Sequence, residues 1–248
     1  MELTNTTAVI TGATGHLAQA IATSLAEHGC DCICHYHTKL DIASQLVKKI
    51  QALGRKAIAI AADLNDPDQI AKLFCINSED WGRAPIRILI NLASNFKRQP
   101  LSKITLDSAR KALDIDLIAP VLTSKEFAKV ISAVDSKQTI GKIINFADVG
   151  GITPWANYTM YCASKAGLIA VTKSLAKELA PAVCVNAIAP GLISFPEDGD
   201  KDEYKRQLKM IPVGRKGTPE EIAAAVIFLL QNDYITGQVL NIDGGRCI

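Results

Sequence analysis

Tyr161 and Lys165 are the residues whose types and spacing first suggest chemistry. They stand four positions apart, which places both side chains on one side of a helix, one turn from each other. A phenol with a pKa near ~10 is a poor acid or base at neutral pH, and a fixed ammonium beside it favours the phenolate. The pair could therefore act as a tunable proton donor. The spacing also occurs by chance, and the plain alternative is a half-buried tyrosine beside a solvated lysine.

The composition narrows the class of protein. The chain has 248 residues, of which 48% are hydrophobic and 21% are charged, which is enough for one large core. A net charge of +2 gives no reason to expect a nucleic-acid partner. No apolar run reaches the ~18 residues of a membrane span, and the first residues lack the basic and apolar leader of an exported protein. We expect a cytoplasmic protein with neither a membrane nor a nucleic-acid partner.

The seven cysteines form neither a CxxC pair nor a cluster with zinc spacing. Cys30, Cys32 and Cys34 alternate along a predicted strand, so they share one face of it. We interpret them as small buried residues in a reducing compartment and predict no metal site.

Short apolar runs alternate with helical patterns along the whole chain. This alternation predicts an α/β fold: a single-domain, Rossmann-type, doubly wound parallel sheet of about seven strands with helices on both faces, spanning residues 1–248. Residues 195–204 interrupt the rhythm, and we predict a mobile substrate loop near 192–210. The predicted strands are 8–10, 31–35, 57–61, 86–91, 143–146, 183–188 and 239–242, and the predicted helices are 16–28, 40–53, one from about 67, 107–134, the one that carries Tyr161, and 219–231.

Ligands bind beyond the carboxyl ends of the strands in a sheet of this kind. Four of the predicted ends carry suggestive residues: Thr11-Gly12, residues 91–96, Asp148 and Pro190-Gly191. Their agreement in position counts for more than any one of them.

A dinucleotide site is predicted at the first two of the strands. Residues 11–18 join the first strand to the first helix, and the glycines in this turn let backbone N–H groups approach a diphosphate at the helix N-terminus. The second strand ends at His37, Thr38 and Lys39, without the carboxylate that an NAD site usually places on the ribose hydroxyls. These donors and this charge suit the 2′-phosphate of NADP. We therefore predict NADP(H) as the cofactor.

Together these residues resemble the short-chain dehydrogenase/reductase family, over essentially the whole chain. The resemblance implies that Tyr161 and Lys165 are catalytic, and that Lys165 binds the nicotinamide ribose and lowers the pKa of Tyr161. The matching motifs are Thr11-Gly12 with Gly15, Asp63, Asn91-Leu92-Ala93-Ser94, Tyr161-Cys162-Ala163-Ser164-Lys165, Pro190-Gly191 and residues 237–245. The implied cofactor-binding residues are Gly12, Thr14, His16, Leu17, His37, Thr38, Lys39, Asp63, Leu64, Asn91, Ala93, Ser94, Tyr161, Lys165, Pro190, Gly191 and Leu192.

A narrower resemblance is to the pteridine reductase branch, which reduces pterins and folates with NADPH. It rests on residues 35–37, residues 91–96, His16 in the first turn, and Asp148. Asp148 stands thirteen residues before the tyrosine, where the wider family has a serine, and the resemblance makes it a third catalytic residue. The implied substrate-binding residues are Phe96, Ser94, Asp148, Trp155 and Tyr161, with Phe96 stacked on the pterin ring, and with Trp155 and residues 195–204 closing the site.

The chemistry of a carboxylate at position 148 agrees with this resemblance. A carboxylate would repel the oxyanion that develops on a carbonyl substrate. A pterin presents N–H donors instead and needs a proton on a ring nitrogen, so Asp148 can accept those hydrogen bonds or relay a proton through Tyr161. The plain alternatives are a strand-end residue that caps a turn for Asp148, and a core aromatic for Phe96.

Two other functions stay open. One is another NADPH reductase of the same fold, such as a 3-oxoacyl thioester reductase or a quinone reductase, against which Asp148 argues. The other is a catalytically weak nucleotide-binding module. Its motivation is His16, Ala18 and Asp116, which stands where the family has a helix asparagine.

The resemblance also implies a homotetramer. The Tyr161 helix and the long helix ending near Val134 would supply an interface, and residues 246–248 would approach a neighbouring subunit.

Overall fold

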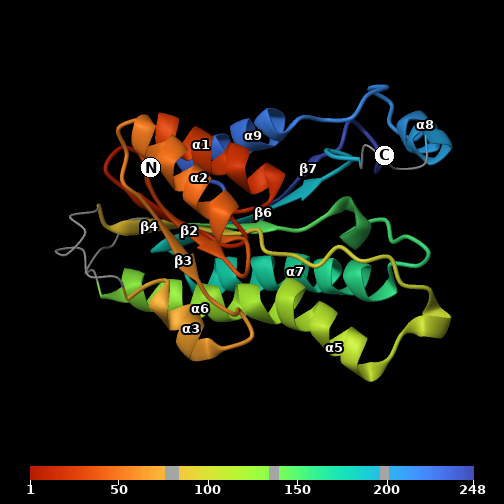
Figure 1. The fold of residues 1–248 in the computed structure, drawn as a ribbon, viewed down its shortest axis with the longest axis horizontal. Coiled ribbons are helices and arrows are strands. Elements are labelled where there is room, and N and C mark those ends of the chain that lie inside the picture. The colour runs from red at the N-terminus through yellow and green to blue at the C-terminus, as the bar shows by residue number, and fades with distance from the viewer. Residues whose placement is uncertain (76–83, 134–139, 196–200) are drawn as a thin grey trace.

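The computed structural model of this chain describes residues 1–75, 84–133, 140–195 and 201–248. Its centre is one sheet of seven parallel strands in the order β3-β2-β1-β4-β5-β6-β7. Successive strands are added on one side of β1 up to β3 and on its other side from β4 onward. Sheets of this type open a ligand crevice at such a switch point, here between β1 and β4. The predicted doubly wound sheet is confirmed (Figure 1). The strands are β1 (Thr7–Ile10), β2 (Asp31–Tyr36), β3 (Ala57–Ala61), β4 (Ile86–Asn91), β5 (Gly141–Phe146), β6 (Val183–Pro190) and β7 (Val239–Ile242).

Helices cover both faces of the sheet, which explains why most strand residues on both faces are apolar (Figure 1). α1, α2 and α9 pack on one face, and α3, α6 and α7 pack on the other. No helix among the described residues is long and apolar enough to cross a membrane. The helices are α1 (His16–Glu27), α2 (Leu40–Ala52), α3 (Pro67–Lys72), α5 (Leu106–Leu113), α6 (Ala119–Ser132), α7 (Thr159–Glu178), α8 (Lys201–Lys209) and α9 (Pro219–Gln231), with short 3-10 turns η1 (Leu101–Lys103) and η3 (Val149–Gly151).

The single long helix predicted over 107–134 is wrong in one respect. α5 and α6 are joined by a π-helical turn, η2 (Asp114–Ile118), in which the N–H of Ala119 bonds the carbonyl of Asp114, five residues back. Pro120 explains the change of pitch, because proline has no N–H to continue the α-helical ladder and its ring crowds the carbonyl four residues earlier. The predicted end at Val134 lies outside the described residues.

The predicted loop near 192–210 is also partly wrong, since α8 begins at Lys201. Asp202 and Glu203 lie in its first turn, where the helix dipole favours negative charge. Ion pairs of the i,i+3 kind join them to Lys205 and Arg206. Residues 196–200 of that prediction lie outside the described part of the chain.

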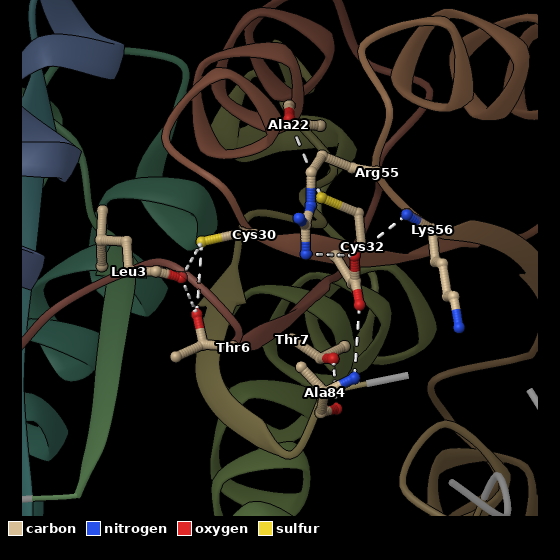
Figure 2. Close-up of polar contacts among 10 residues, drawn as sticks. Leu3, Thr6, Thr7, Ala22, Cys30, Cys32, Arg55, Lys56 and Ala84 are labelled. Atoms are coloured by element: carbon tan, nitrogen blue, oxygen red, sulfur yellow. Dashed lines mark hydrogen bonds and ion pairs between the residues drawn. The ribbon is translucent and has the colours of Figure 1, made fainter. Parts of the chain in front are cut away.

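Buried polar groups at the amino end of β2 stabilise the fold. They lie at the opposite edge of the sheet from the carboxyl ends of the strands, where a ligand would bind. The Asp31 carboxylate accepts hydrogen bonds from Arg55 and from the backbone N–H of Lys56 at 2.9 Å each, and from the N–H of Ala84 at 3.3 Å (Figure 2). The Cys30 thiol donates to the carbonyl of Leu3 at 3.3 Å (Figure 2).

The predicted burial of the three alternating thiols is confirmed. Burial raises the pKa of Cys30 and of Cys32, and it raises the pKa of Cys34 to about 12. Thiols of this kind stay protonated and act as small apolar residues.

Candidate active site

Two strand ends, one helix and a π-helical turn bring the candidate catalytic residues together. Ser94 follows β4, Asp148 follows β5, and Tyr161 and Lys165 lie on the first two turns of α7. Asp116 joins them from the π turn between α5 and α6, and its side chain is fully buried. The parallel sheet places these residues at one edge because all of its strands end on the same side.

The hydroxyl of Tyr161 donates a hydrogen bond to Oδ2 of Asp148 at 2.8 Å. Oδ1 of Asp148 accepts from the backbone N–H of Gly150 at 2.7 Å, so the carboxyl also caps the η3 turn. Burial raises the pKa of Asp148, although these hydrogen bonds and the nearby Lys165 and Arg246 oppose the rise. The Asp148 side chain therefore does both things at once: one oxygen caps the turn, and the other accepts a hydrogen bond from Tyr161.

The net pKa of Tyr161 is raised in this structure, in contrast to the lowered pKa predicted for it. Burial raises the pKa of Tyr161 well above its usual range, and the neighbouring charge of Asp148 raises it further. The Lys165 ammonium lies over the tyrosine ring, 5.6 Å from its centroid. A phenol in this state keeps its proton at neutral pH, so it is not a base, and it is a weaker acid than a free tyrosine.

Lys165 is held by other groups. Its Nζ atom lies 3.1 Å from Oδ1 of Asp116 and donates a hydrogen bond to the carbonyl of Phe146 at 3.0 Å. Oδ1 of Asp116 also accepts from the Ser94 hydroxyl at 2.5 Å, and Oδ2 accepts from the N–H of Asn95 at 3.3 Å. The buried ammonium is therefore paired with a carboxylate that is itself hydrogen-bonded, which is the condition under which a buried ion pair is tolerated.

The Asn91 side chain is buried among protein groups, and its predicted place beside the nicotinamide stays a prediction. Its amide nitrogen donates to Oδ1 of Asn145 at 2.9 Å, and its Oδ1 accepts from the Thr123 hydroxyl at 2.7 Å. Asn145 in turn donates to Thr172 at 2.9 Å. The network ties the ends of β4 and β5 to α6 and α7.

An aromatic cluster borders the Tyr161 hydroxyl. Phe96 is 60% exposed, so it is not a core aromatic. Its ring stacks on Tyr158 with centroids 5.0 Å apart and meets the Tyr161 ring edge-on at 4.9 Å. Trp155 packs edge-on against both Phe96, at 6.4 Å, and Tyr158, at 5.8 Å. The structure thus brings together Phe96, Trp155 and Tyr161 as predicted.

Sequence reasoning missed Tyr158 as a member of this cluster. Its position three residues before Tyr161 at the start of the same helix was the available signal. Both tyrosines also line a small pocket of about 70 Å³, together with Lys97, Ile104 and Lys111.

The turn after β1 is shaped as a dinucleotide cradle. Gly12 has a φ of +65°, and a Cβ atom there would lie 2.8 Å from Cα of Ala93, so glycine alone lets the two strand-end turns meet. α1 begins at His16 with Gly15 as its N-cap and has no capping side chain. Its first backbone N–H groups are therefore left for an anion.

His35 has a structural role that its place in the predicted cofactor segment did not suggest. The N–H of Gly12 donates to its Nδ1 at 3.0 Å, and its Nε2 lies 3.0 Å from the carbonyl of Ala62. Burial lowers the pKa of His35. The neutral ring thus joins the glycine turn to the end of β3.

The ribose end of the crevice offers positive charge and hydroxyl groups. His37, Thr38 and Lys39 follow β2 and are all exposed. Asp63 is occupied by hydrogen bonds from Asn65 at 2.9 Å, and the predicted Leu64 has a buried side chain. With no carboxylate directly after β2, these residues fit a nucleotide that carries a 2′-phosphate.

The remaining predicted cofactor residues lie at the same edge of the sheet. Pro190 ends β6, and a Cβ atom at Gly191 would lie 2.7 Å from Cα of Asp243, so this turn also needs glycine. Leu192 accepts a hydrogen bond from the N–H of Gly217 at 3.0 Å. Thr14 is half-buried, and its carbonyl accepts from Gln19 at 3.1 Å.

Comparison with known proteins places the chain among oxidoreductases. The family described as enoyl-(acyl carrier protein) reductase matches residues 12–246. A 3-oxoacyl-[acyl-carrier-protein] reductase from Synechocystis sp. is 34% identical over 98% of this chain and 97% of its own length. A galactitol 2-dehydrogenase from Agrobacterium fabrum is 34% identical over 99% of each chain, and a 3beta-hydroxysteroid dehydrogenase from Eggerthella lenta is 32% identical over 100% of this chain and 95% of its own.

Two solved structures have the same architecture. One, described as a short-chain alcohol dehydrogenase from Sinorhizobium meliloti 1021, has a TM-score of 0.90 and 28% identity over 99% of this chain and 97% of its own. The other is a blue fluorescent protein from a metagenomic library, solved in complex with NADPH, with a TM-score of 0.88 and 29% identity over the whole of both chains.

Proposed function

Since this chain belongs to the short-chain dehydrogenase/reductase family, we propose that it is an NADPH-dependent reductase of pterins and folates, which reduces a C=N bond of the pterin ring. The family membership makes it an oxidoreductase, and the substrate class is inferred from the site.

The crevice suits NADPH. The free N-terminus of α1 and the turn at Gly12 would hold the diphosphate, and His37, Thr38 and Lys39 would hold the 2′-phosphate. Lys165 would bind the nicotinamide ribose, as the family resemblance implies. NADPH, when bound, supplies the hydride, while this chain's residues orient the substrate and deliver the proton. The complex of NADPH with a structural neighbour supports the choice of cofactor.

The observation that carries the proposal is the 2.8 Å hydrogen bond from Tyr161 to Asp148. A neutral phenol beside a carboxylate can give its proton to a ring nitrogen, and the carboxylate can accept the ring's N–H groups or return a proton to the phenol. Asp148 is well placed for both tasks because only Gly150 and Tyr161 occupy it among the described residues.

The aromatic cluster suits a flat heterocycle. Phe96 is a largely exposed residue whose ring contacts the Tyr161 ring, and offset stacking on such a ring is favourable for planar ligands. We propose that Phe96 and Trp155 border the substrate ring. We also propose that Ser94, whose hydroxyl is hydrogen-bonded to Asp116, contacts the substrate.

The second candidate is reduction of a 3-oxoacyl thioester, which the Synechocystis relative favours more than it favours a pterin. One structural observation is compatible with it. Burial raises the pKa of Asp148, and a carboxyl group that keeps its proton can donate a hydrogen bond to a carbonyl oxygen as a serine does.

The test is the initial rate of NADPH oxidation with dihydrobiopterin, dihydrofolate and acetoacetyl-coenzyme A. Turnover of either of the first two supports the proposal. Turnover of the thioester alone selects the second candidate. Tight NADPH binding without turnover of any substrate selects a nucleotide-binding module.

We also propose that residues 1–248 act as one NADP-binding domain that assembles as a homotetramer and works in a reducing compartment such as the cytoplasm. Free buried thiols on β2 support the last point. Sedimentation of the pure protein tests the assembly.

A further inference from the structure

The C-terminal segment brings a cation to the rim of the candidate site. The Arg246 guanidinium lies 5.5 Å from the centroid of the Trp155 ring. Trp155 also contacts Phe96 and Tyr158, and a Cβ atom at Gly150 would lie 3.2 Å from the Trp155 ring. Trp155 is therefore in contact both with the guanidinium and with the aromatic cluster around Tyr161.

The position of Arg246 is fixed on three sides. The tail that carries it is folded back by Asp243, which accepts from the N–H groups of Gly245 at 2.9 Å and Cys247 at 3.0 Å. One Arg246 nitrogen donates to Oε1 of Gln207 on α8 at 2.5 Å.

The Gln207 amide is itself oriented. Its nitrogen donates to Glu203 at 2.5 Å, which turns its oxygen toward Arg246. The stack on Trp155, the folded tail and this amide leave little freedom to the guanidinium, so less entropy is lost when it binds a ligand.

No carboxylate among the described residues lies within ion-pair distance of Arg246. Its charge nevertheless reaches the site, since it opposes the rise in the pKa of Asp148. A half-buried arginine with spare N–H donors and a planar fork matches a carboxylate or a phosphate.

We propose that Arg246, stacked on Trp155, is a specificity residue that anchors the anionic tail of an extended substrate. Within the proposed function the anchored group is a carboxylate of the folate tail. In the second candidate it is a phosphate of the coenzyme carrier. The two sources share one chemistry, an anion that projects beyond the reacting group toward α8 and the C-terminus. The proposal rests on the proposed active site but not on either substrate class.

Two pairs of ligands test it, each pair matched in the reacting group and different in the charge of the tail. Dihydrofolate is compared with dihydrobiopterin, and acetoacetyl-coenzyme A with the acetoacetyl thioester of N-acetylcysteamine. Dissociation constants are measured by calorimetry on the protein loaded with NADP⁺, where the cofactor has no hydride to transfer, and KM is measured where turnover occurs. The variants are Arg246→Gln and Arg246→Lys. The control is Arg215→Gln, which removes one positive charge from an exposed arginine outside the candidate site.

We expect Arg246→Gln to weaken the anionic member of at least one pair about ten- to a hundredfold relative to its uncharged partner, as the loss of a charge-assisted hydrogen bond predicts. Arg246→Lys should restore part of this difference, and Arg215→Gln should leave it unchanged. Equal effects on both members of every pair, or no binding by any of the four ligands, would overturn the proposal. If the thioester pair alone separates, Arg246 anchors the phosphate of the coenzyme carrier and not the folate carboxylate, while turnover of dihydrobiopterin still decides the pterin function.

Discussion

The Tyr161 hydroxyl and the Asp148 carboxylate share a 2.8 Å hydrogen bond at the carboxyl end of β5. Thirteen residues separate them in the chain. β5, the η3 turn and the first turn of α7 bring them together, and burial raises the pKa of both groups. The site thus holds a proton between a phenol and a carboxylate, where a serine would offer only a hydroxyl.

Removal of the phenol hydroxyl tests Tyr161 as the proton donor. In Tyr161→Phe the ring stays in the aromatic cluster, so we expect the NADPH dissociation constant to stay near that of the natural protein. The turnover number should fall by about 10² to 10⁴, the usual contribution of general acid catalysis. Tyr234→Phe, at a fully exposed tyrosine, is the control. Full activity in Tyr161→Phe would exclude this role.

The buried pair between Asp116 and Lys165 makes a prediction about stability. Asp116→Ala leaves a buried ammonium without its carboxylate, which typically costs about 3–5 kcal/mol of unfolding free energy. Asp116→Asn should cost less, because the amide oxygen can still accept from Lys165. The control is Asp107→Ala, which breaks an exposed ion pair with Lys111 and should change little. Urea denaturation gives all three values, and similar losses for Asp116→Ala and Asp107→Ala would contradict the buried pair.

Asp148 predicts a pH-dependent difference in stability. Because its pKa is raised on folding, the folded protein binds this proton more tightly than the unfolded chain does. The unfolding free energy therefore falls as the pH rises from the ordinary aspartate pKa of ~3.9 through the higher folded pKa. Asp148→Asn lacks this proton yet keeps an oxygen for the Tyr161 hydroxyl. We expect the variant to gain stability relative to the natural protein between pH 4 and pH 7, as measured by urea denaturation at each pH. A constant difference would show that Asp148 titrates as an ordinary carboxyl.

The positive charge of Lys39 after β2 predicts a preference for NADPH over NADH. Lys39→Asp should weaken NADPH binding by about tenfold or more, since it replaces a cation near the proposed 2′-phosphate with an anion. NADH binding should be unchanged or improved. Lys48→Asp, at an exposed position about two turns further along α2, makes the same change in net charge and is the control. Equal losses for NADPH and NADH would place the 2′-phosphate elsewhere.

Much of the fold could be predicted because the deciding signals are local. β5 and β6 are apolar runs whose residues are all buried, and α9 carries its own capping box of Thr218 and Glu221. The strand-end rule for parallel sheets placed Asp148 at the ligand edge, and the family resemblance implied its partnership with Tyr161, which the hydrogen bond between them matches.

The features that could not be predicted depend on contacts distant in sequence. Asp116 reaches Lys165 only because a π turn before Pro120 changes the helix pitch. Its position follows from packing and not from any local pattern. The same is true of Arg246, whose place on Trp155 depends on the folded tail and on α8.

In the proposed mechanism, Asp148 directs Tyr161 toward a ring nitrogen. The most direct measurement is the ratio of kcat/KM for dihydrobiopterin to that for acetoacetyl-coenzyme A, in the natural protein and in Asp148→Ser. We predict a ratio above one in the natural protein and a fall of about a hundredfold or more in the variant, because the serine removes the carboxylate and restores a donor for a carbonyl oxygen. If the natural protein prefers the thioester, or if the substitution leaves the ratio unchanged, Asp148 does not direct Tyr161 toward a ring nitrogen.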